Sequence, residues 1–81
     1  MAPETYVEIH DESTRYRLSK AHDGTLVLDC YGQTTCIETF ADGIQLARYC
    51  QKKNIDLNLF FSKLPAWDKA VAVQFAKGIY R

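Results

Sequence analysis

RYRLSKAHDGTLVLDCYG, residues 15–32, alternates apolar and polar side chains on both sides of a short His-Asp-Gly segment. Alternation with a period of two is typical of a β-strand that has one buried face. Gly24 can adopt the left-handed backbone conformation that closes a three-residue hairpin loop with a bulge. The stretch therefore predicts two antiparallel strands joined by a tight turn, the first of them over residues 15–21.

The length of this loop sets the register of the hairpin. A two-residue Asp-Gly loop would place Leu18 opposite Asp29, whereas a loop of residues 22–24 matches apolar with apolar residues and opposite charges with each other. We therefore prefer the three-residue loop, which predicts the cross-strand pairs Leu18–Leu28, Tyr16–Cys30 and Arg17–Asp29.

The next turn, at residues 31–34, has Gly32 as the first of two central residues, as a type II′ hairpin requires. This turn places Ile37 opposite Leu28 on the inner face and Cys36 on the outer face. Cys30 and Cys36 would then point away from each other, and a disulfide cannot join side chains that diverge. We predict that Cys30 is a small core residue and that Cys36 is a thiol on the outer face.

The remaining strand and the helices follow from hydrophobic periodicity. Residues 6–10 alternate like a half-buried strand, and after residue 38 the period changes to about 3.6, which indicates a helix. We predict a helix over residues 40–53 that begins with a Thr39–Asp42 capping box. Residues 55–61 fit either a strand or a short helix capped by Asp56, and we favour the helix.

Pro65 suits the first turn of a C-terminal helix over residues 65–77, which Gly78 can end. Strands followed by helices predict an α+β fold, because an antiparallel sheet needs one covered face. We expect a single domain over residues 1–81, with strands at about 5–40 and helices at about 40–78. Its sheet is a four-stranded antiparallel meander, with two or three C-terminal helices packed on one face.

Charge and composition are those of an ordinary globular chain. The 81 residues have a net charge of zero, but residues 1–40 contain seven acidic and three basic residues, and residues 41–81 contain three acidic and seven basic residues. The halves thus carry −4 and +4. The sequence has neither a signal-peptide pattern nor a long apolar run, and an odd number of cysteines favours reduced thiols. We expect a cytoplasmic protein that does not bind membranes.

The sequence predicts neither a metal site nor a catalytic site. The cysteines and the two histidines, His10 and His22, lack the paired short spacings of zinc ligands. Cys36 and His10 share the predicted outer face, but no third residue would orient them and nothing supplies an oxyanion hole. The glycines are scattered and form no phosphate-binding loop. We therefore expect a protein that is not an enzyme and has no cofactor.

The predicted outer face of the sheet is the first candidate site. Tyrosine and arginine are enriched at the residues that dominate protein–protein binding. The residues predicted to contact a partner protein on this face are Tyr6, His10, Arg17, Tyr31 and Cys36. An exposed aromatic residue among Phe60, Phe61 and Trp67 is a second hypothesis, and it would contact a partner or a second copy of the chain.

The alternative is nucleic-acid binding through a basic surface on the helices. The residues predicted to contact nucleic acid or an acidic partner are Arg48, Lys52, Lys53 and Lys69. The zero net charge argues against this alternative, as do the acidic residues among the tyrosines on the sheet face.

Strands followed by helices in a short chain are similar to the architecture of small phage-encoded inhibitors, the anti-CRISPR proteins among them. The similarity covers architecture only and includes no diagnostic residue. It implies a phage protein that acts as a stoichiometric inhibitor. The leading expectation rests on the outer face of the sheet or the exposed end of the helical layer: a small protein-binding module, such as an inhibitor or adaptor of a larger complex, whose partner is not predicted.

Overall fold

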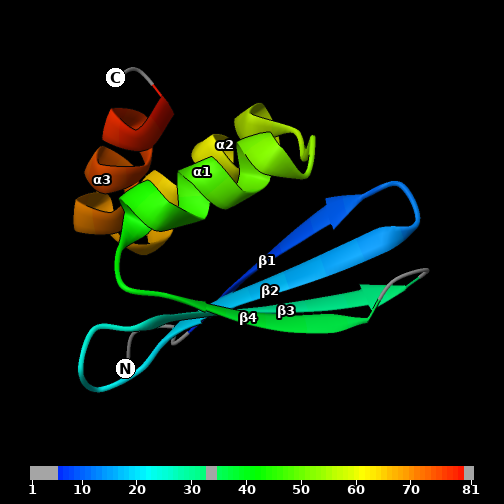
Figure 1. Cartoon of the computed structure of the whole chain (residues 1–81), viewed down its shortest axis with the longest axis horizontal. Coiled ribbons are helices and arrows are strands. Elements are labelled where there is room, and N and C mark those ends of the chain that lie inside the picture. Colours follow the sequence, from blue (N-terminus) through cyan, green and yellow to red (C-terminus); the bar gives the residue numbers. More distant parts are fainter. Residues whose placement is uncertain (1–5, 33–34, 80–81) are drawn as a thin grey trace.

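A computed structural model describes residues 6–32 and 35–79. Four strands form an antiparallel sheet in the order β1-β2-β3-β4, and three helices follow them (Figure 1). The elements are β1 (Tyr6–Asp11), β2 (Thr14–Lys20), β3 (Leu26–Gly32), β4 (Cys36–Phe40), α1 (Gly43–Lys52), α2 (Leu57–Trp67) and α3 (Lys69–Ile79). The predicted α+β meander with C-terminal helices on one face is confirmed.

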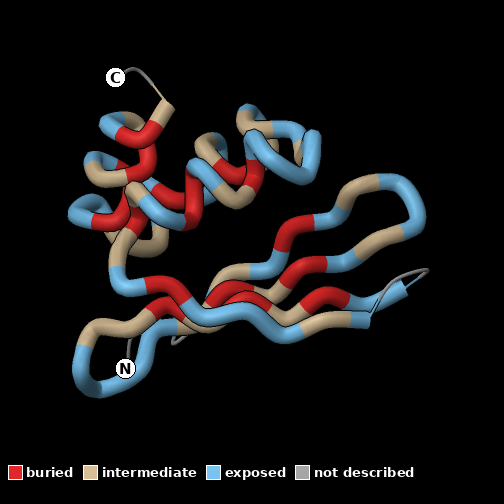
Figure 2. Tube along the Cα trace, in the orientation of Figure 1, coloured by how far each residue is buried: buried red, intermediate tan, exposed pale blue. Residues whose placement is uncertain are grey.

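The hydrophobic core lies between the sheet and the helical layer. Figure 2 shows that buried segments of the strands alternate with exposed ones and that the helices are buried along one side. Phe60 of α2 is fully buried at the centre of this core. Its ring centroid lies 5.5 Å from that of Tyr16 on β2 and 6.2 Å from that of Phe75 on α3. Phe60 thus connects the two layers.

The hairpin of β2 and β3 has the predicted register. Leu18 pairs with Leu28, and Arg17 pairs with Asp29. The Ala21 N–H donates to the Thr25 carbonyl at 2.8 Å, which closes the loop of residues 22–24. Gly24 has a φ of 92°, in the left-handed region that glycine occupies without strain. The loop length that was inferred from residue matching is therefore confirmed.

The predicted register of β3 and β4 is wrong by one residue. Cys36 pairs with Cys30, and Ile37 pairs with Asp29. The physical reason is Phe40, which belongs to β4 and is buried on the inner face with only 8% of its surface exposed. Because side chains alternate along a strand, an inward Phe40 turns Cys36 inward and Ile37 outward.

The predicted start of the first helix is also wrong. α1 begins at Gly43, and its N-cap is Asp42, whose carboxylate accepts a hydrogen bond from the Gln45 N–H at 3.1 Å. The Gln45 side chain accepts one from the Ala41 N–H at 3.2 Å. Thr39 cannot cap the helix because it lies within β4. The cap therefore lies three residues later than predicted, and the second bond of a capping box is replaced by one to the residue before the N-cap.

Residues 57–61 are helical, as preferred, and Asp56 is the N-cap of α2. The predicted boundary at Pro65 is wrong, because Pro65 lies inside α2 and the next helix begins at Lys69. Asp68 separates the two helices. Its N–H donates to the Leu64 carbonyl of α2, and its carboxylate accepts from the N–H groups of Ala70 and Val71 at 3.0 and 3.3 Å. Asp68 is thus the N-cap of α3, and its two hydrogen bonds place the helix boundary at Asp68 and not at Pro65.

Gly78 does not end the last helix as predicted, since α3 continues to Ile79. It is buried against α1 instead. A Cβ at this position would lie 2.8 Å from both the Ala47 Cβ and the Ile44 carbonyl oxygen. The missing side chain therefore allows the close packing of α1 on α3.

Asp68 also joins the helical layer to the sheet, because its carboxylate lies 2.9 Å from the Lys20 Nζ of β2. This ion pair, with the backbone N–H of Val71, holds the pKa of Asp68 below its usual value. The unfolded carboxyl has a pKa of about 3.9. The stabilisation is therefore complete above about pH 4 and is lost as the pH falls through the lower folded pKa.

We expect Asp68→Asn to lower the free energy of unfolding by less than about 1 kcal/mol at pH 7, because asparagine keeps the cap and loses only an exposed ion pair. The difference from the wild type should shrink toward zero in acid. Urea titrations of the wild type and of Asp68→Asn, from pH 7 into the acid range, would measure this difference in the free energy of unfolding. Lys20→Met removes the other partner of the ion pair and is the matched control. A difference that stays constant throughout the acid range would contradict the assignment.

Candidate functional site: the outer face of the sheet

The face of the sheet that points away from the helices carries side chains from all four strands. The strand residues of the hydrophobic core lie on the opposite face. The register defines three rows across the outer face: Tyr6, Ser19, Val27 and Thr39; Glu8, Arg17, Asp29 and Ile37; and His10, Arg15 and Tyr31. In Figure 1 the helices lie on one side of the sheet only. Among the described residues, none therefore covers this outer face.

Arg17 is the centre of the outer face. Its guanidinium carbon lies 4.8 Å from the ring centroid of Tyr6 and 5.8 Å from that of Tyr31. It also donates to the Glu8 carboxylate at 3.2 Å, a hydrogen bond that raises the pKa of Arg17. Cation–π contacts at exposed sites contribute about 0.5–1 kcal/mol each. These contacts hold Arg17 in one orientation at the surface, and we call Tyr6, Arg17 and Tyr31 the Arg17 cluster.

The two tyrosines leave much of their surface for a partner. Tyr6 and Tyr31 are each 42% exposed. Within the described part of the chain, the Arg17 Nε is a buried donor without a hydrogen-bond acceptor. A buried donor without an acceptor costs free energy, so the cluster is not optimised for stability alone.

The structure brings together three of the five residues predicted for this face, namely Tyr6, Arg17 and Tyr31. His10 lies on the same face, in the row of Tyr31, and is exposed. Cys36 was placed wrongly, because β4 turns it toward the helices. Ile37 occupies the outer face instead and is 70% exposed. The one signal that could have identified Ile37 is Phe40, because a buried Phe40 within the strand would turn Ile37 outward by period-two alternation.

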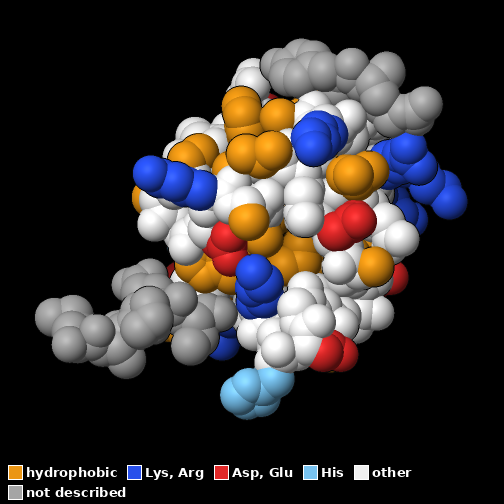
Figure 3. Space-filling model, turned by 90° about the vertical axis from the view of Figure 1, so that its left-hand side faces the viewer, with side chains coloured by type: hydrophobic (Ala, Val, Ile, Leu, Met, Phe, Trp, Pro, Cys, Tyr) orange, Lys and Arg blue, Asp and Glu red, His pale blue; other side chains and the backbone are white. Residues whose placement is uncertain are grey.

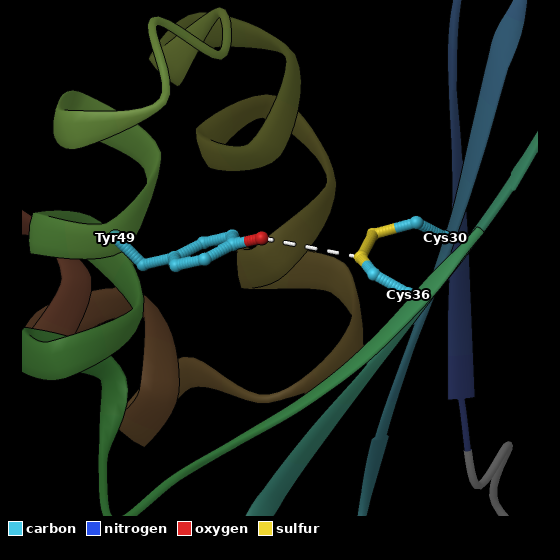
Figure 4. Close-up of a disulfide and its surroundings, with 3 residues drawn as sticks. All are labelled: Cys30, Cys36 and Tyr49. Atoms are coloured by element: carbon cyan, nitrogen blue, oxygen red, sulfur yellow. Dashed lines mark hydrogen bonds between the residues drawn. A yellow bond between two sulfur atoms is a disulfide. The ribbon is translucent and has the colours of Figure 1, made fainter. Parts of the chain in front are cut away.

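Cys30 and Cys36 form a disulfide on the inner face, which corrects the prediction that they diverge (Figure 4). Their Cα atoms lie 5.0 Å apart, within the range that a disulfide spans. The Tyr49 hydroxyl of α1 approaches the Cys36 Sγ at 3.9 Å. Burial, and secondly the nearby Glu38 carboxylate, raise the pKa of Tyr49, so its phenol is neutral at pH 7.

The disulfide changes what the cysteines can do chemically. Cys36 lies on the opposite face from His10, so the two cannot act as a nucleophile and its base. Cys50 is the remaining free cysteine, and burial raises the pKa of its thiol to about 12. In the described ranges, no group of three or more His, Cys, Asp or Glu side chains could hold a metal ion.

The basic residues predicted to bind nucleic acid lie in two places. Arg48 and Lys52 are exposed on α1, and Lys53, the C-cap of that helix, lies 6.0 Å from the ring of Tyr49. Lys69 belongs to α3 and lines a groove that contains no α1 residue. The four residues therefore come from two places, α1 with its C-cap and α3, and a shared basic surface stays a prediction.

No family model matches the chain, and no curated protein or solved structure matches it either. Within the residues that the structure describes, none of the helices has the length and apolar character needed to span a membrane.

Proposed function

We propose that this protein is a non-enzymatic module that binds another protein stoichiometrically through the outer face of its sheet, as an inhibitor or adaptor of a larger complex. The observation that supports this most directly is the Arg17 cluster, an ordered guanidinium between two half-exposed tyrosine rings. Tyrosine and arginine are enriched among the residues that dominate binding energy, and tyrosine buries a large area at low entropic cost.

The surroundings of the cluster favour a protein partner over a nucleic acid. Ile37 extends the apolar part of the face across β4, and the aliphatic residue Val27 lies in the same row as Tyr6. Glu8 and Asp29 flank Arg17 on the same face and would repel phosphates. A pre-ordered arginine also loses less conformational entropy on binding than a mobile one.

We expect Arg17→Ala to weaken partner binding at least about tenfold, as removal of a central interface residue does. The partner would first be identified by affinity capture of the wild-type protein from cells that make it, followed by mass spectrometry. Affinity for the purified partner would then be measured by calorimetry. Arg48→Ala removes an exposed arginine from α1, away from the outer face, and is the control.

The outcomes separate the two functions. Loss of binding in Arg17→Ala but not in Arg48→Ala supports the sheet face, provided that both variants keep the wild-type circular dichroism. Capture that disappears after nuclease treatment, together with loss of binding in Arg48→Ala, would favour nucleic-acid binding through the basic helices. Unchanged affinity in Arg17→Ala would refute the proposal for the outer face.

A further inference from the structure

A second surface, formed by α2 and α3, has features of a binding site. An open groove of about 770 Å³ runs between these helices. Its lining residues are Phe61 and Pro65 of α2, and Lys69, Ala72, Val73, Ala76 and Lys77 of α3. None of them comes from the strands, so the groove is separate from the outer face of the sheet.

The groove follows a single stripe along α3. Positions 69, 72, 73, 76 and 77 are spaced i, i+3, i+4, i+7 and i+8, which places them on one side of a helix. The small side chains of Ala72 and Ala76 form its floor, and Val73 is 55% exposed. The Phe61 ring also lines the groove, and its centroid lies 6.2 Å from that of Phe75. A shallow apolar surface formed by two neighbouring helices is one on which a third helix can pack.

The charges of the groove specify its occupant further. Lys69 and Lys77 stand at its two ends, about 12 Å apart along the helix axis. Neither is paired in the described part of the chain, where the ion pairs are Arg17–Glu8 and Lys20–Asp68. No acidic residue lines the groove. Figure 3, which views the molecule from the side of α3, shows several areas of hydrophobic side chains on this face, with Lys and Arg as well as Asp and Glu side chains beside them.

We propose that the α2–α3 groove binds an amphipathic helix of a partner protein, with its apolar ridge on Val73 and acidic side chains, about two turns apart, paired with Lys69 and Lys77. A symmetric pair of two copies is disfavoured, because it would bring the lysines of both copies together. Binding of the same apolar side chains and lysines to an anionic membrane surface is the competing outcome, and the test below includes it. This site goes beyond the proposed function of the outer face.

The test uses a displayed library of helix-forming peptides of about 18 residues, or roughly five turns. Peptides would be selected on the wild-type protein, and their affinities for it and for Val73→Glu would be compared. Val73 is exposed, so this substitution should leave the fold intact. We expect the selected peptides to carry an apolar ridge flanked by acidic residues and to bind Val73→Glu at least about tenfold more weakly.

A charge exchange tests the role of the lysines. A selected peptide whose acidic residues are changed to lysine should bind the wild type more weakly, and the double variant Lys69→Glu/Lys77→Glu should prefer this lysine peptide over the parent. Arg17→Ala, which lies on the other surface, should bind the parent peptide like the wild type. The two proposals can fail separately. Loss of peptide binding in the groove with intact partner binding by the outer face would refute only the groove, and the opposite result would refute only the outer face.

Four results would overturn the groove proposal. They are a selection that yields no peptide dependent on Val73, selected peptides without acidic residues, and no change of preference in the double variant. The fourth is evidence for a different occupant. Self-association in sedimentation that Val73→Glu abolishes would indicate a second copy of the chain, and binding to phosphatidylserine vesicles that requires Val73 would indicate a membrane.

Discussion

Phe60→Ala is expected to remove about 3–5 kcal/mol of the free energy of unfolding, as is typical for a fully buried phenylalanine. A chain of 81 residues has a typical total of about 4–12 kcal/mol, so this one substitution removes about a quarter of the total or more, and it unfolds the protein if the total lies near the lower end. The reason is the position of Phe60 between Tyr16 of the sheet and Phe75 of the helices, where it is 0% exposed. Deleting its ring opens a cavity that the two layers cannot both fill.

Phe61→Ala is the matched control, because it deletes the same atoms from the next residue of α2. Phe61 is only partly buried and contacts Phe75 at the edge of the core. Its loss should cost about half as much as that of Phe60, because less apolar area returns to water. Urea unfolding followed by circular dichroism and by the fluorescence of Trp67 measures both. Equal losses in the two variants would contradict the packing described for α2.

Cys36→Ala is expected to lower the free energy of unfolding by about 2 kcal/mol under oxidising conditions, from the entropy that a cross-link of this loop length removes from the unfolded chain. The difference should largely disappear when a phosphine reductant opens the disulfide in the wild type. Urea titrations of both proteins with and without the reductant measure this effect.

A count of free thiols provides the control for this prediction. The chain has three cysteines, and the oxidised protein should show one reactive thiol after denaturation, from Cys50. After reduction it should show three. Cys50→Ala should leave no reactive thiol in the oxidised state. Three free thiols in the oxidised protein would mean that Cys30 and Cys36 do not pair, and the stability difference should then be absent.

The candidate site was predictable to the extent that it depends on the registers of the first three strands. Arg17 and Tyr31 fall on one face because the loop at residues 22–24 sets the pairing of β2 with β3, and the loop length is encoded locally by Gly24 and by matched side chains. Alternation alone places Tyr6 on the same face. These three residues could therefore be grouped before their contacts were known.

Ile37 and the disulfide were not predictable in the same way. Gly32 suggested a two-residue turn, but in the structure it is the last residue of β3, with a φ of 120°. The pairing of β4 depends instead on the burial of Phe40 beneath the helices. Sequence periodicity assigns Phe40 to the first helix, so it does not indicate that the burial of Phe40 turns Cys36 inward. The position of Pro65 was misjudged for a similar reason, because Asp68 competes with it for the helix boundary.

The sequence by itself determined the order of strands and helices, the register of the β2–β3 hairpin and the grouping of Tyr6, Arg17 and Tyr31. Period and loop chemistry act over a few neighbouring residues, so they can be recognised in the linear chain. Only the tertiary structure decided the register of β4, the pairing of Cys30 with Cys36 and the groove between α2 and α3. Each of these depends on which side chains the helical layer buries, and that choice is made between residues far apart in the sequence.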